Sequence, residues 1–272
     1  MHSRSFVAMA TLAALGLACL TVRADAAAPE TVSFPGSGPT ASVTLSGTFY
    51  RATTEGRAPV VVLLHPCDGI SSFVKDWAAW FVAHGYSALI VDSFTPRGVV
   101  TLCGRPGSPD AQERGFDALG ALAWLRTRPD VDGERIGAIG WSHGGGAAMA
   151  ADAARNVAQS DVAGGGFRAV VGFYPPCRQV HTNAIAAPLL LLLGGNDESQ
   201  PPQFCNEVVT RLDPGGPPAV VHIYPGEPHA FDDQPANGTD TVLGKLLPLA
   251  YASRATVDAH KQVLAFFAAQ LR

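Results

Sequence analysis

The sequence predicts an α/β protein whose mostly parallel sheet is doubly wound, with helices on both faces. Short, continuous apolar runs alternate along the chain with stretches of helical periodicity. The runs have the length of strands and lack polar alternation, as expected for strands that are buried on both faces. A Gly-x-Ser-x-Gly segment, residues 140–144, lies between one such run and a helix-compatible stretch. A serine at a strand-to-helix turn is typical of this fold class.

Composition indicates a folded protein that does not bind nucleic acid. The 272-residue chain has 47% hydrophobic and 15% charged residues, enough apolar material for a sizeable core. Its formal net charge of -4 and its lack of a Lys/Arg cluster give no attraction to nucleic acid or to anionic membranes. No internal repeat is visible, so residues 27–272 are expected to form a single domain.

The N-terminus has the layout of a secretory signal peptide. Arg4 precedes the uncharged apolar run 6–22, and small residues at Ala24 and Ala26 fit an A-x-A cleavage site. We expect residues 1–26 to be removed by cleavage after Ala26 or Ala28. This predicts a secreted or periplasmic protein without stable membrane insertion after cleavage. An uncleaved anchor is the alternative; a lipoprotein through Cys19 is less favoured because Gly16 stands where a larger apolar residue is usual.

The strands are expected at apolar or alternating runs. Alternation over 42–50 predicts one or two antiparallel edge strands within 27–58. Buried strands are predicted at 59–64, 87–91, 135–139, 169–174, 188–193 and 219–224.

Helices are expected between these strands. One begins at Ser71 or Ser72 and runs through His84, where Gly85 closes it. A second covers 110–128 and is stopped by Pro129. A helix follows Ser142 and fades before 164–166, and others are predicted near 201–212 and 253–270.

Ser142 is the expected nucleophile. Glycine on either side makes room in a tight, strained turn where a Cβ would clash. The turn lifts the hydroxyl clear of the backbone at a helix N-terminus, whose free N–H groups favour developing negative charge.

The base and the acid are expected on loops after later strands, because the working residues of such sheets lie at the carboxyl ends of strands. Asp197 follows the 189–193 strand and His229 follows the 220–224 strand. The chain order Ser, Asp, His is that of an α/β-hydrolase triad. Glu198 is an alternative acid. Asp232 and Asp233 are interpreted as solvated loop charges.

An oxyanion hole needs two backbone N–H donors. The N–H of His143, directly after the nucleophile, is one candidate, and its side chain is expected to line the pocket. The second donor should come from the loop after the 60–64 strand. Pro66 has no N–H, so Cys67 is the better candidate. The role of Asp68 stays open.

Four cysteines remain after export: Cys67, Cys103, Cys177 and Cys205. In an oxidising compartment they suggest two disulfides, with three possible connectivities. Their spacing does not fit a zinc site, and H-E-x-x-H is absent. We therefore expect neither a metal nor a cofactor.

From about residue 40 to its C-terminus, the chain resembles the dienelactone hydrolase family of α/β-hydrolases. The matching segments are Leu64-His65-Pro66-Cys67-Asp68-Gly69, Val91-Asp92-Ser93-Phe94-Thr95-Pro96-Arg97-Gly98, Gly140-Trp141-Ser142-His143-Gly144-Gly145, Gly194-Gly195-Asn196-Asp197 and Pro228-His229-Ala230-Phe231. The fold that this resemblance implies places Cys67 and Cys103 after neighbouring strands, and Cys177 and Cys205 around the Asp197 loop. It therefore implies the pairs Cys67–Cys103 and Cys177–Cys205.

Two departures from the family pattern bear on the substrate. The name-giving enzymes use a cysteine nucleophile paired with a glutamate, whereas here Ser142 is the nucleophile and Pro66 stands at the glutamate position. They also hold a substrate carboxylate with arginines. Arg97 matches one of these, but Asp232 and Asp233 occupy the region of the other. Dienelactone is therefore a poor candidate substrate.

The resemblance and the residues together predict an exported serine hydrolase that acts on small esters or lactones through an acyl-enzyme. The expected pocket walls are Phe94, Arg97, Trp141, Tyr174 and Phe231. One alternative is a prolyl-oligopeptidase-type peptidase, which usually carries a large extra N-terminal domain. Another is an inactive binding protein on the hydrolase scaffold. The oligomeric state is not predicted.

Overall fold

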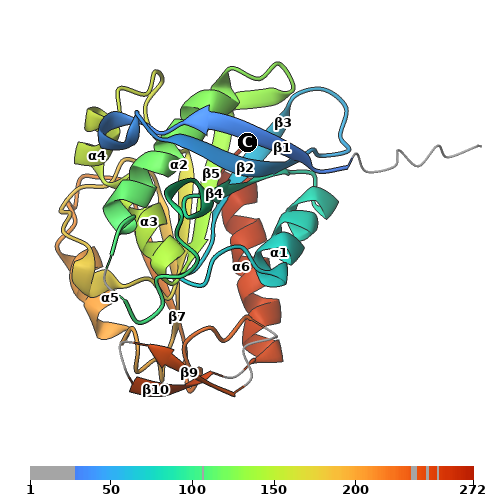
Figure 1. Ribbon diagram of the computed structural model, residues 1–272. Coiled ribbons are helices and arrows are strands. Elements are labelled where there is room, and N and C mark those ends of the chain that lie inside the picture. The colour runs from blue at the N-terminus through green and yellow to red at the C-terminus, as the bar shows by residue number, and fades with distance from the viewer. Residues whose placement is uncertain (1–27, 106, 234–237, 243–244, 250) are drawn as a thin grey trace, which may run out of the picture.

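The computed structural model describes residues 28–105, 107–233, 238–242, 245–249 and 251–272. Within them, an eight-stranded sheet has the order β1-β2-β4-β3-β5-β6-β7-β8 (Figure 1). The strands are β1 (Glu30–Pro35), β2 (Thr44–Tyr50), β3 (Ala58–Leu64), β4 (Ser87–Asp92), β5 (Val131–Trp141), β6 (Ala169–Phe173), β7 (Leu189–Gly194) and β8 (Ala219–Tyr224). The expected signal peptide, residues 1–26, lies outside the described residues.

The sheet is antiparallel at one edge and parallel elsewhere. β1 pairs with β2 and β2 with β4 in antiparallel register, whereas every neighbouring pair from β4 across to β8 is parallel. The parallel strands follow the predicted apolar runs, and β3 and β7 are buried along almost their whole length. The predicted α/β class with a mostly parallel sheet is confirmed.

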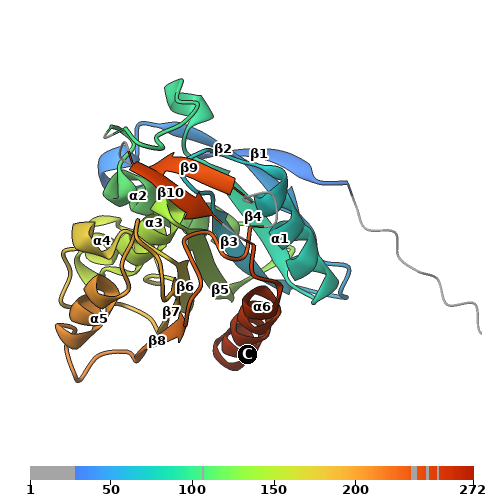
Figure 2. The same ribbon diagram turned by 90° about the horizontal axis from the view of Figure 1, so that it is seen from below.

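Helices cover both faces of the sheet (Figure 2). On one face, α2 (Ala111–Arg126), α3 (His143–Asp152) and α5 (Gln203–Thr210) contribute side chains to one apolar cluster. On the other face, α1 (Ser72–Ala83) and α6 (Ser253–Gln270) contribute to a second cluster. A short helix, α4 (Ala154–Gln159), follows α3. None of the described helices is long and apolar enough to span a membrane.

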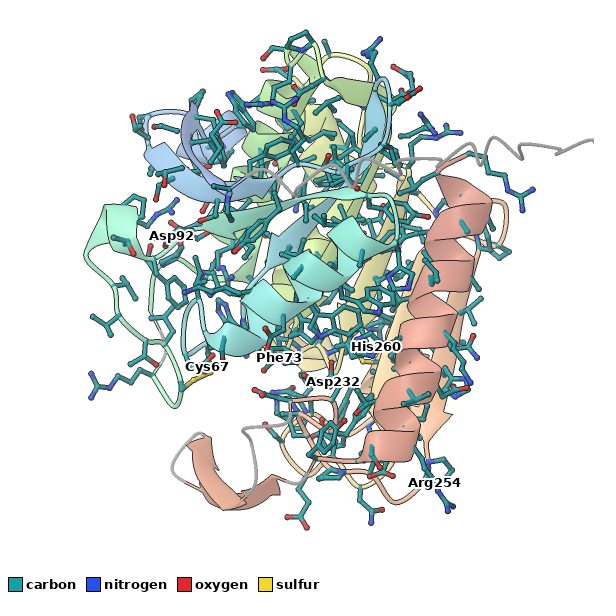
Figure 3. The ribbon with its side chains drawn as sticks, turned by 90° about the vertical axis from the view of Figure 1, so that its right-hand side faces the viewer. Cys67, Phe73, Asp92, Asp232, Arg254 and His260 are labelled. Atoms are coloured by element: carbon teal, nitrogen blue, oxygen red, sulfur yellow. A yellow bond between two sulfur atoms is a disulfide. The ribbon has the colours of Figure 1, made fainter. Side chains whose placement is uncertain are left out.

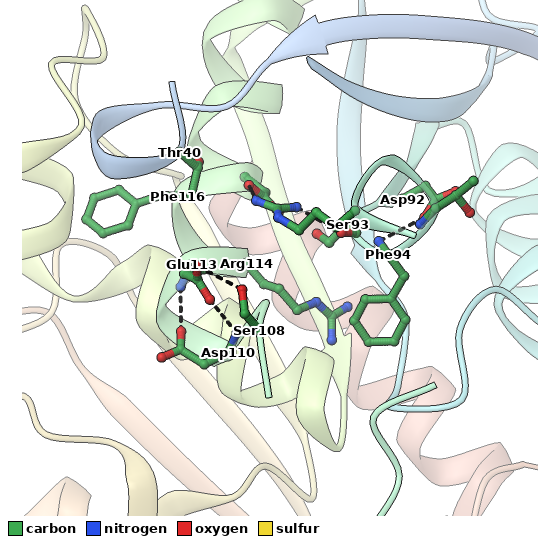
Figure 4. Close-up of polar contacts among 12 residues, drawn as sticks. Thr40, Asp92, Ser93, Phe94, Ser108, Asp110, Glu113, Arg114 and Phe116 are labelled. Carbon is green, nitrogen blue, oxygen red and sulfur yellow. Dashed lines mark hydrogen bonds and ion pairs between the residues drawn. The ribbon is translucent and has the colours of Figure 1, made fainter. Parts of the chain in front are cut away.

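Helix α2 begins with a capping box (Figure 4). The side chain of Asp110 accepts a hydrogen bond from the N–H of Glu113 at 2.8 Å, and the Glu113 carboxylate accepts one from the N–H of Asp110 at 2.8 Å. This arrangement satisfies two N–H groups that a helix start leaves unpaired. It fixes the point at which α2 enters the fold, one turn before a buried arginine, Arg114.

A two-stranded antiparallel hairpin was not expected. β9 (Gly238–Val242) pairs with β10 (Lys245–Leu249), and neither strand joins the main sheet. Along the chain the hairpin lies between the His229 loop and α6, and in space it lies beyond the end of the sheet (Figure 1). Seen from below, it lies on the side of α2 and α3 (Figure 2). The segment contains glycine and proline, which favour a loop.

Candidate active site

Ser142 occupies the turn between β5 and α3. β5 ends at Trp141 and α3 begins at His143, so this single residue connects the strand to the helix. Its backbone has φ 50 and ψ -116, a conformation that a residue with a side chain rarely adopts. Its N–H donates to the carbonyl of Phe173 at 2.9 Å, which anchors the turn to the end of β6.

The glycines around Ser142 are required by close backbone approach. A Cβ at Gly140 would collide with the carbonyl of Gly144, and a Cβ at Gly144 would collide with the carbonyl of Leu64 at the end of β3. The Gly-x-Ser-x-Gly sequence therefore lets β5, the turn and α3 pack against the loop that follows β3. This is the physical reason that a serine with these flanking glycines marks the site.

The side chains of Ser142, His229 and Asp197 form a hydrogen-bonded chain. Nε2 of His229 lies 3.0 Å from Oγ of Ser142, and Nδ1 lies 2.7 Å from Oδ2 of Asp197. An ionised carboxylate only accepts hydrogen bonds, so Nδ1 carries the ring proton and Nε2 is left to accept the serine proton. The three residues come from the loops after β5, β8 and β7, as expected from the sequence.

Asp197 is held in a fixed orientation. It is 3% exposed, and its second oxygen accepts a hydrogen bond from the N–H of Gln200 at 2.7 Å. The alternative acid, Glu198, has an exposed side chain. His229 is 7% exposed, and its ring packs against Tyr174 with 4.6 Å between ring centroids.

The two expected oxyanion donors lie on anchored segments. The residue after Ser142, His143, is the first residue of α3. On the loop after β3, the carbonyl of Cys67 accepts a hydrogen bond from the N–H of Leu102 at 2.8 Å, and its sulfur is bonded to Cys103. The second disulfide joins Cys177 to Cys205. Both pairings are those that the family resemblance implies.

A buried arginine, Arg114 of α2, connects the two segments that carry these donors. Its Nη2 donates to the carbonyl of His65 at 2.6 Å, and its Nη1 lies 2.6 Å from Nδ1 of His143. Its guanidinium also lies over the Phe94 ring, 4.9 Å from the centroid, as the pair appears in Figure 4. Burial lowers the pKa of Arg114 to about 9, so it keeps its charge at neutral pH.

This contact sets the state of the His143 ring. Burial, and then the Arg114 charge, lower the pKa of His143 to about 3. Nδ1 accepts a hydrogen bond from the Arg114 guanidinium, which can only donate, so the neutral His143 ring carries its proton on Nε2. Arg114 could not be singled out from the sequence, because one arginine in a predicted helix is usually a surface residue.

The expected pocket walls are mostly core residues. Trp141 and Phe231 are fully buried, Tyr174 is 2% exposed and Phe94 is 2% exposed. Their rings pack against other rings behind the site and offer little surface to a ligand. The sequence pattern could not separate the wall of a pocket from the layer behind it, because both are apolar.

Arg97 is bound to the protein itself. Its guanidinium donates to both oxygens of Asp117, at 2.8 and 2.9 Å, and to the carbonyl of Ser93 at 2.8 Å. The Asp117 side chain is fully buried, and that of Arg97 is 14% exposed. In this arrangement Arg97 neutralises a buried carboxylate rather than a carboxylate on a ligand.

The interpretation of Asp232 as a solvated charge is wrong. Asp232 is 4% exposed and accepts hydrogen bonds from the Tyr174 hydroxyl at 2.6 Å and from Nε1 of Trp141 at 3.1 Å. Burial raises its pKa to about 7. The pKa of Asp233 is also raised, to about 6, by partial burial and by the charge of Asp68.

Comparison with known proteins identifies the family. The sequence profile of the dienelactone hydrolase family matches residues 45–271. The chain belongs to the dienelactone hydrolase family. A Bradyrhizobium protein, to which 2-oxo-3-(5-oxofuran-2-ylidene)propanoate lactonase activity is ascribed, is 26% identical over 203 residues, covering 67% of this chain and 77% of that protein. Membership supports a hydrolase of the ester or lactone type.

Solved structures share the dienelactone hydrolase fold. A dienelactone hydrolase-like promiscuous phosphotriesterase from metagenomic libraries has a TM-score of 0.68 at 19% identity, covering 90% of this chain and all of that chain. A Mycobacterium tuberculosis puromycin-hydrolysing peptidase has a TM-score of 0.61 at 17% identity, with 89% of this chain but only 39% of that chain covered. At these identities the likeness establishes the fold alone.

Among the described residues, no group of three or more His, Cys, Asp or Glu side chains is arranged to hold a metal ion.

Proposed function

We propose that this dienelactone hydrolase family member is an exported serine esterase that cleaves small carboxylic esters or lactones. The observation that carries the proposal is the hydrogen-bonded chain from Ser142 through His229 to Asp197, at 3.0 and 2.7 Å. A serine hydroxyl is a poor nucleophile unless a base removes its proton, and the base must be held by a third group. The three side chains supply these roles in contact with one another.

In the proposed reaction, Oγ of Ser142 attacks the ester carbonyl while Nε2 of His229 takes the hydroxyl proton. The charge on the carbonyl oxygen is stabilised by the N–H groups of His143 and Cys67. His229 then returns the proton to the leaving alcohol, and an acyl-serine remains. Water attacks the acyl-serine with His229 again as the base, which releases the acid and restores Ser142. Asp197 orients the ring and stabilises its charged form.

The proposed substrates are uncharged at the position that the name-giving enzymes bind through arginine. Arg97 is engaged by Asp117 and Ser93, and Asp232 and Asp233 bring carboxyl groups to the region after His229. A substrate with a carboxylate beside the scissile bond would find no free arginine at either place. Neutral short-chain esters and neutral lactones therefore fit the site better than dienelactone.

Hydrolysis of p-nitrophenyl esters from acetate to octanoate tests the proposal, with the mature protein and its Ser142→Ala variant compared. We expect turnover in the mature protein and a loss of at least about a thousandfold in the variant. Equal turnover by both proteins would exclude Ser142 as the nucleophile. Including peptide p-nitroanilides tests the peptidase alternative, which predicts amide cleavage at a comparable rate.

The exported location is also a proposal. The two disulfides, Cys67–Cys103 and Cys177–Cys205, support it because such bonds persist in oxidising compartments. N-terminal sequencing of the protein recovered outside the cytoplasm should begin near residue 27 or 29. A full-length chain retained in the cytoplasm would contradict it.

A further inference from the structure

A cavity lies between α1 and α6. It has a volume of about 430 Å³ and is lined by the aromatic side chains of Phe73, Trp77, Trp80 and Tyr251. Figure 3 shows Phe73, Asp232 and His260 close together in this part of the molecule. None of Ser142, Asp197 and His229 belongs to its described lining. This volume is within the range of small-molecule sites.

Two carboxyl groups lie at this cavity, and the exposed one, Asp76, is the main source of negative charge, since burial raises the pKa of Asp232 to about 7. Asp76, on the exposed side of α1, and the buried Asp232 both line the cavity. In the described part of the chain, neither carboxyl group forms a salt bridge, and the described lining contains no Lys or Arg. His260 also lines the cavity, but burial lowers its pKa, so its ring is uncharged at neutral pH.

The aromatic rings add to this negative potential and restrict the kind of ligand. Trp80 is half-buried and meets Trp77 edge to face with 5.2 Å between ring centroids. The buried Trp77 ring is stacked on the His260 ring, 4.0 Å away, so Trp80 is the indole that a ligand can reach. The faces of aromatic rings attract cations, most strongly for tryptophan. Rings do not replace the water around a metal ion as carboxylates and carbonyls do. The lining therefore suits a cation whose charge is spread over an apolar body.

We propose that this cavity binds an organic cation, a substituted ammonium group with an apolar or aromatic body. The ammonium lies against the Trp80 ring near Asp76, and the apolar body fills the remaining space beside Phe73 and Tyr251. An anion would meet the Asp76 and Asp232 carboxyl groups, and the described lining has no Lys or Arg to compensate for them. The proposal goes beyond ester hydrolysis, because it needs neither Ser142 nor a reaction.

The experiment uses the mature protein carrying Ser142→Ala, so that no turnover interferes. Isothermal titration with choline and with its uncharged isostere 3,3-dimethylbutan-1-ol isolates the contribution of the positive charge. We expect choline to bind about tenfold or more tightly than the isostere. Benzyltrimethylammonium should bind more tightly than choline because its ring buries additional apolar surface.

Two variants locate the site. Trp80→Ala removes a half-buried ring and Asp76→Asn an exposed charge, and each should weaken choline binding about three- to tenfold. Glu207→Gln removes an exposed carboxylate from α5, on the opposite face of the sheet, and should leave binding unchanged. Trp80→Phe keeps an aromatic ring and should retain most of the affinity, which separates ring loss from misfolding.

Equal affinity for choline and its isostere would overturn the proposal. So would binding that is unaffected by both Trp80→Ala and Asp76→Asn, or an absence of binding at millimolar concentration. These outcomes are independent of the esterase proposal. If the protein hydrolyses esters but binds no ammonium compound, only the proposed cation site is refuted. If it binds ammonium compounds but hydrolyses no ester, only the proposed esterase activity is refuted.

Discussion

The backbone around Ser142 is packed so closely that a Cβ at either flanking glycine would collide with a neighbouring carbonyl group. The carbonyl of Leu64 occupies the space where a Cβ of residue 144 would lie. Because that carbonyl belongs to the end of β3, it can move only if the strand or the turn moves. The sequence pattern predicted this turn correctly because the pattern is itself the steric requirement.

Gly144→Ala tests this requirement. We expect a loss of at least about 3 kcal/mol in the free energy of unfolding, since the collision is with backbone and cannot be relieved by a side-chain rotation. Denaturant titration measures it. Gly107→Ala is the matched control, because its Cβ would meet only the end of the Leu102 side chain at 3.3 Å. Equal stability of both variants would contradict the steric account.

Arg114 is expected to act as a positioning residue. Replacing it with Gln removes the link between the His65 carbonyl and the His143 ring, the two sides of the proposed oxyanion hole. We predict a fall in kcat of about ten- to a hundredfold with a nearly unchanged KM, since oxyanion stabilisation acts in the transition state. Arg155→Gln, an exposed arginine, should change neither constant. A rise in KM alone would point to a role in substrate binding.

Asp232 gives a pH-dependent contribution to stability. The folded protein holds its proton more tightly than the unfolded chain does, since burial raises the pKa from 3.8 to about 7. The free energy of unfolding should therefore fall as the pH rises from about 4 to about 7, with a slope of at most about 1.4 kcal/mol per pH unit from this group.

Asp232→Asn replaces the titrating carboxyl group with an amide that does not titrate. The free energy of unfolding should therefore depend less on pH in this variant. Thermal unfolding at pH 5 and pH 8 measures the change: the loss of Tm between the two conditions should be smaller in the variant than in the parent protein. Asp161→Asn, an exposed loop aspartate, serves as the control. An identical loss of Tm in Asp232→Asn would show that Asp232 is already ionised at pH 5.

Arg114 and Asp232 also show what sequence reasoning misses. Their partners are distant along the chain: 49 residues separate Arg114 from His65, and 91 separate Asp232 from Trp141. The motifs around Ser142, Asp197 and His229 are local and can be recognised in a single sequence. A buried charge satisfied across the fold leaves no local pattern, so it is interpreted as an ordinary surface residue.

At the scale of elements, the two disulfides are expected to stabilise the fold equally but to affect catalysis differently. They close segments of 36 and 28 residues, and loop-closure entropy gives roughly 4 kcal/mol for each. Only Cys67–Cys103 holds the loop that carries a proposed oxyanion donor. The Cys67→Ala/Cys103→Ala pair should therefore lose more of its kcat than the Cys177→Ala/Cys205→Ala pair.

Urea titration and steady-state kinetics on the two double variants test this difference. Similar midpoints with a selective loss of kcat in the Cys67/Cys103 variant are the expected result. An equal loss of kcat in both variants would mean that the Cys67 loop is held in place without its disulfide.

The elements themselves were predicted to different degrees. Runs such as Val60–Leu64 and Leu189–Leu193 are buried on both faces, so their composition marks them as strands. The β9–β10 hairpin pairs only with itself and has no apolar run of that kind. Its segment contains glycine and proline, which favour a loop, and so the hairpin could not be predicted from its residues.

For the whole molecule, the chain order determines how the site is assembled. Parallel strands deliver the loops after β5, β7 and β8 to one edge of the sheet, and this brings Ser142, Asp197 and His229 together from positions up to 87 residues apart. Sequence motifs were sufficient to predict that these three side chains lie close together. They were not sufficient for the substrate pocket, because Trp141 and Phe231 lie behind the site rather than at its surface.

The most direct test of the central claim is covalent labelling of the mature protein with an organophosphonate, followed by intact-mass and peptide mass spectrometry. The account predicts one adduct per chain on Ser142, formed at a rate that falls in the His229→Ala variant and is zero in Ser142→Ala. A protein that remains unlabelled, or is labelled at another residue, would contradict the proposed serine hydrolase and favour a binding protein on a hydrolase scaffold.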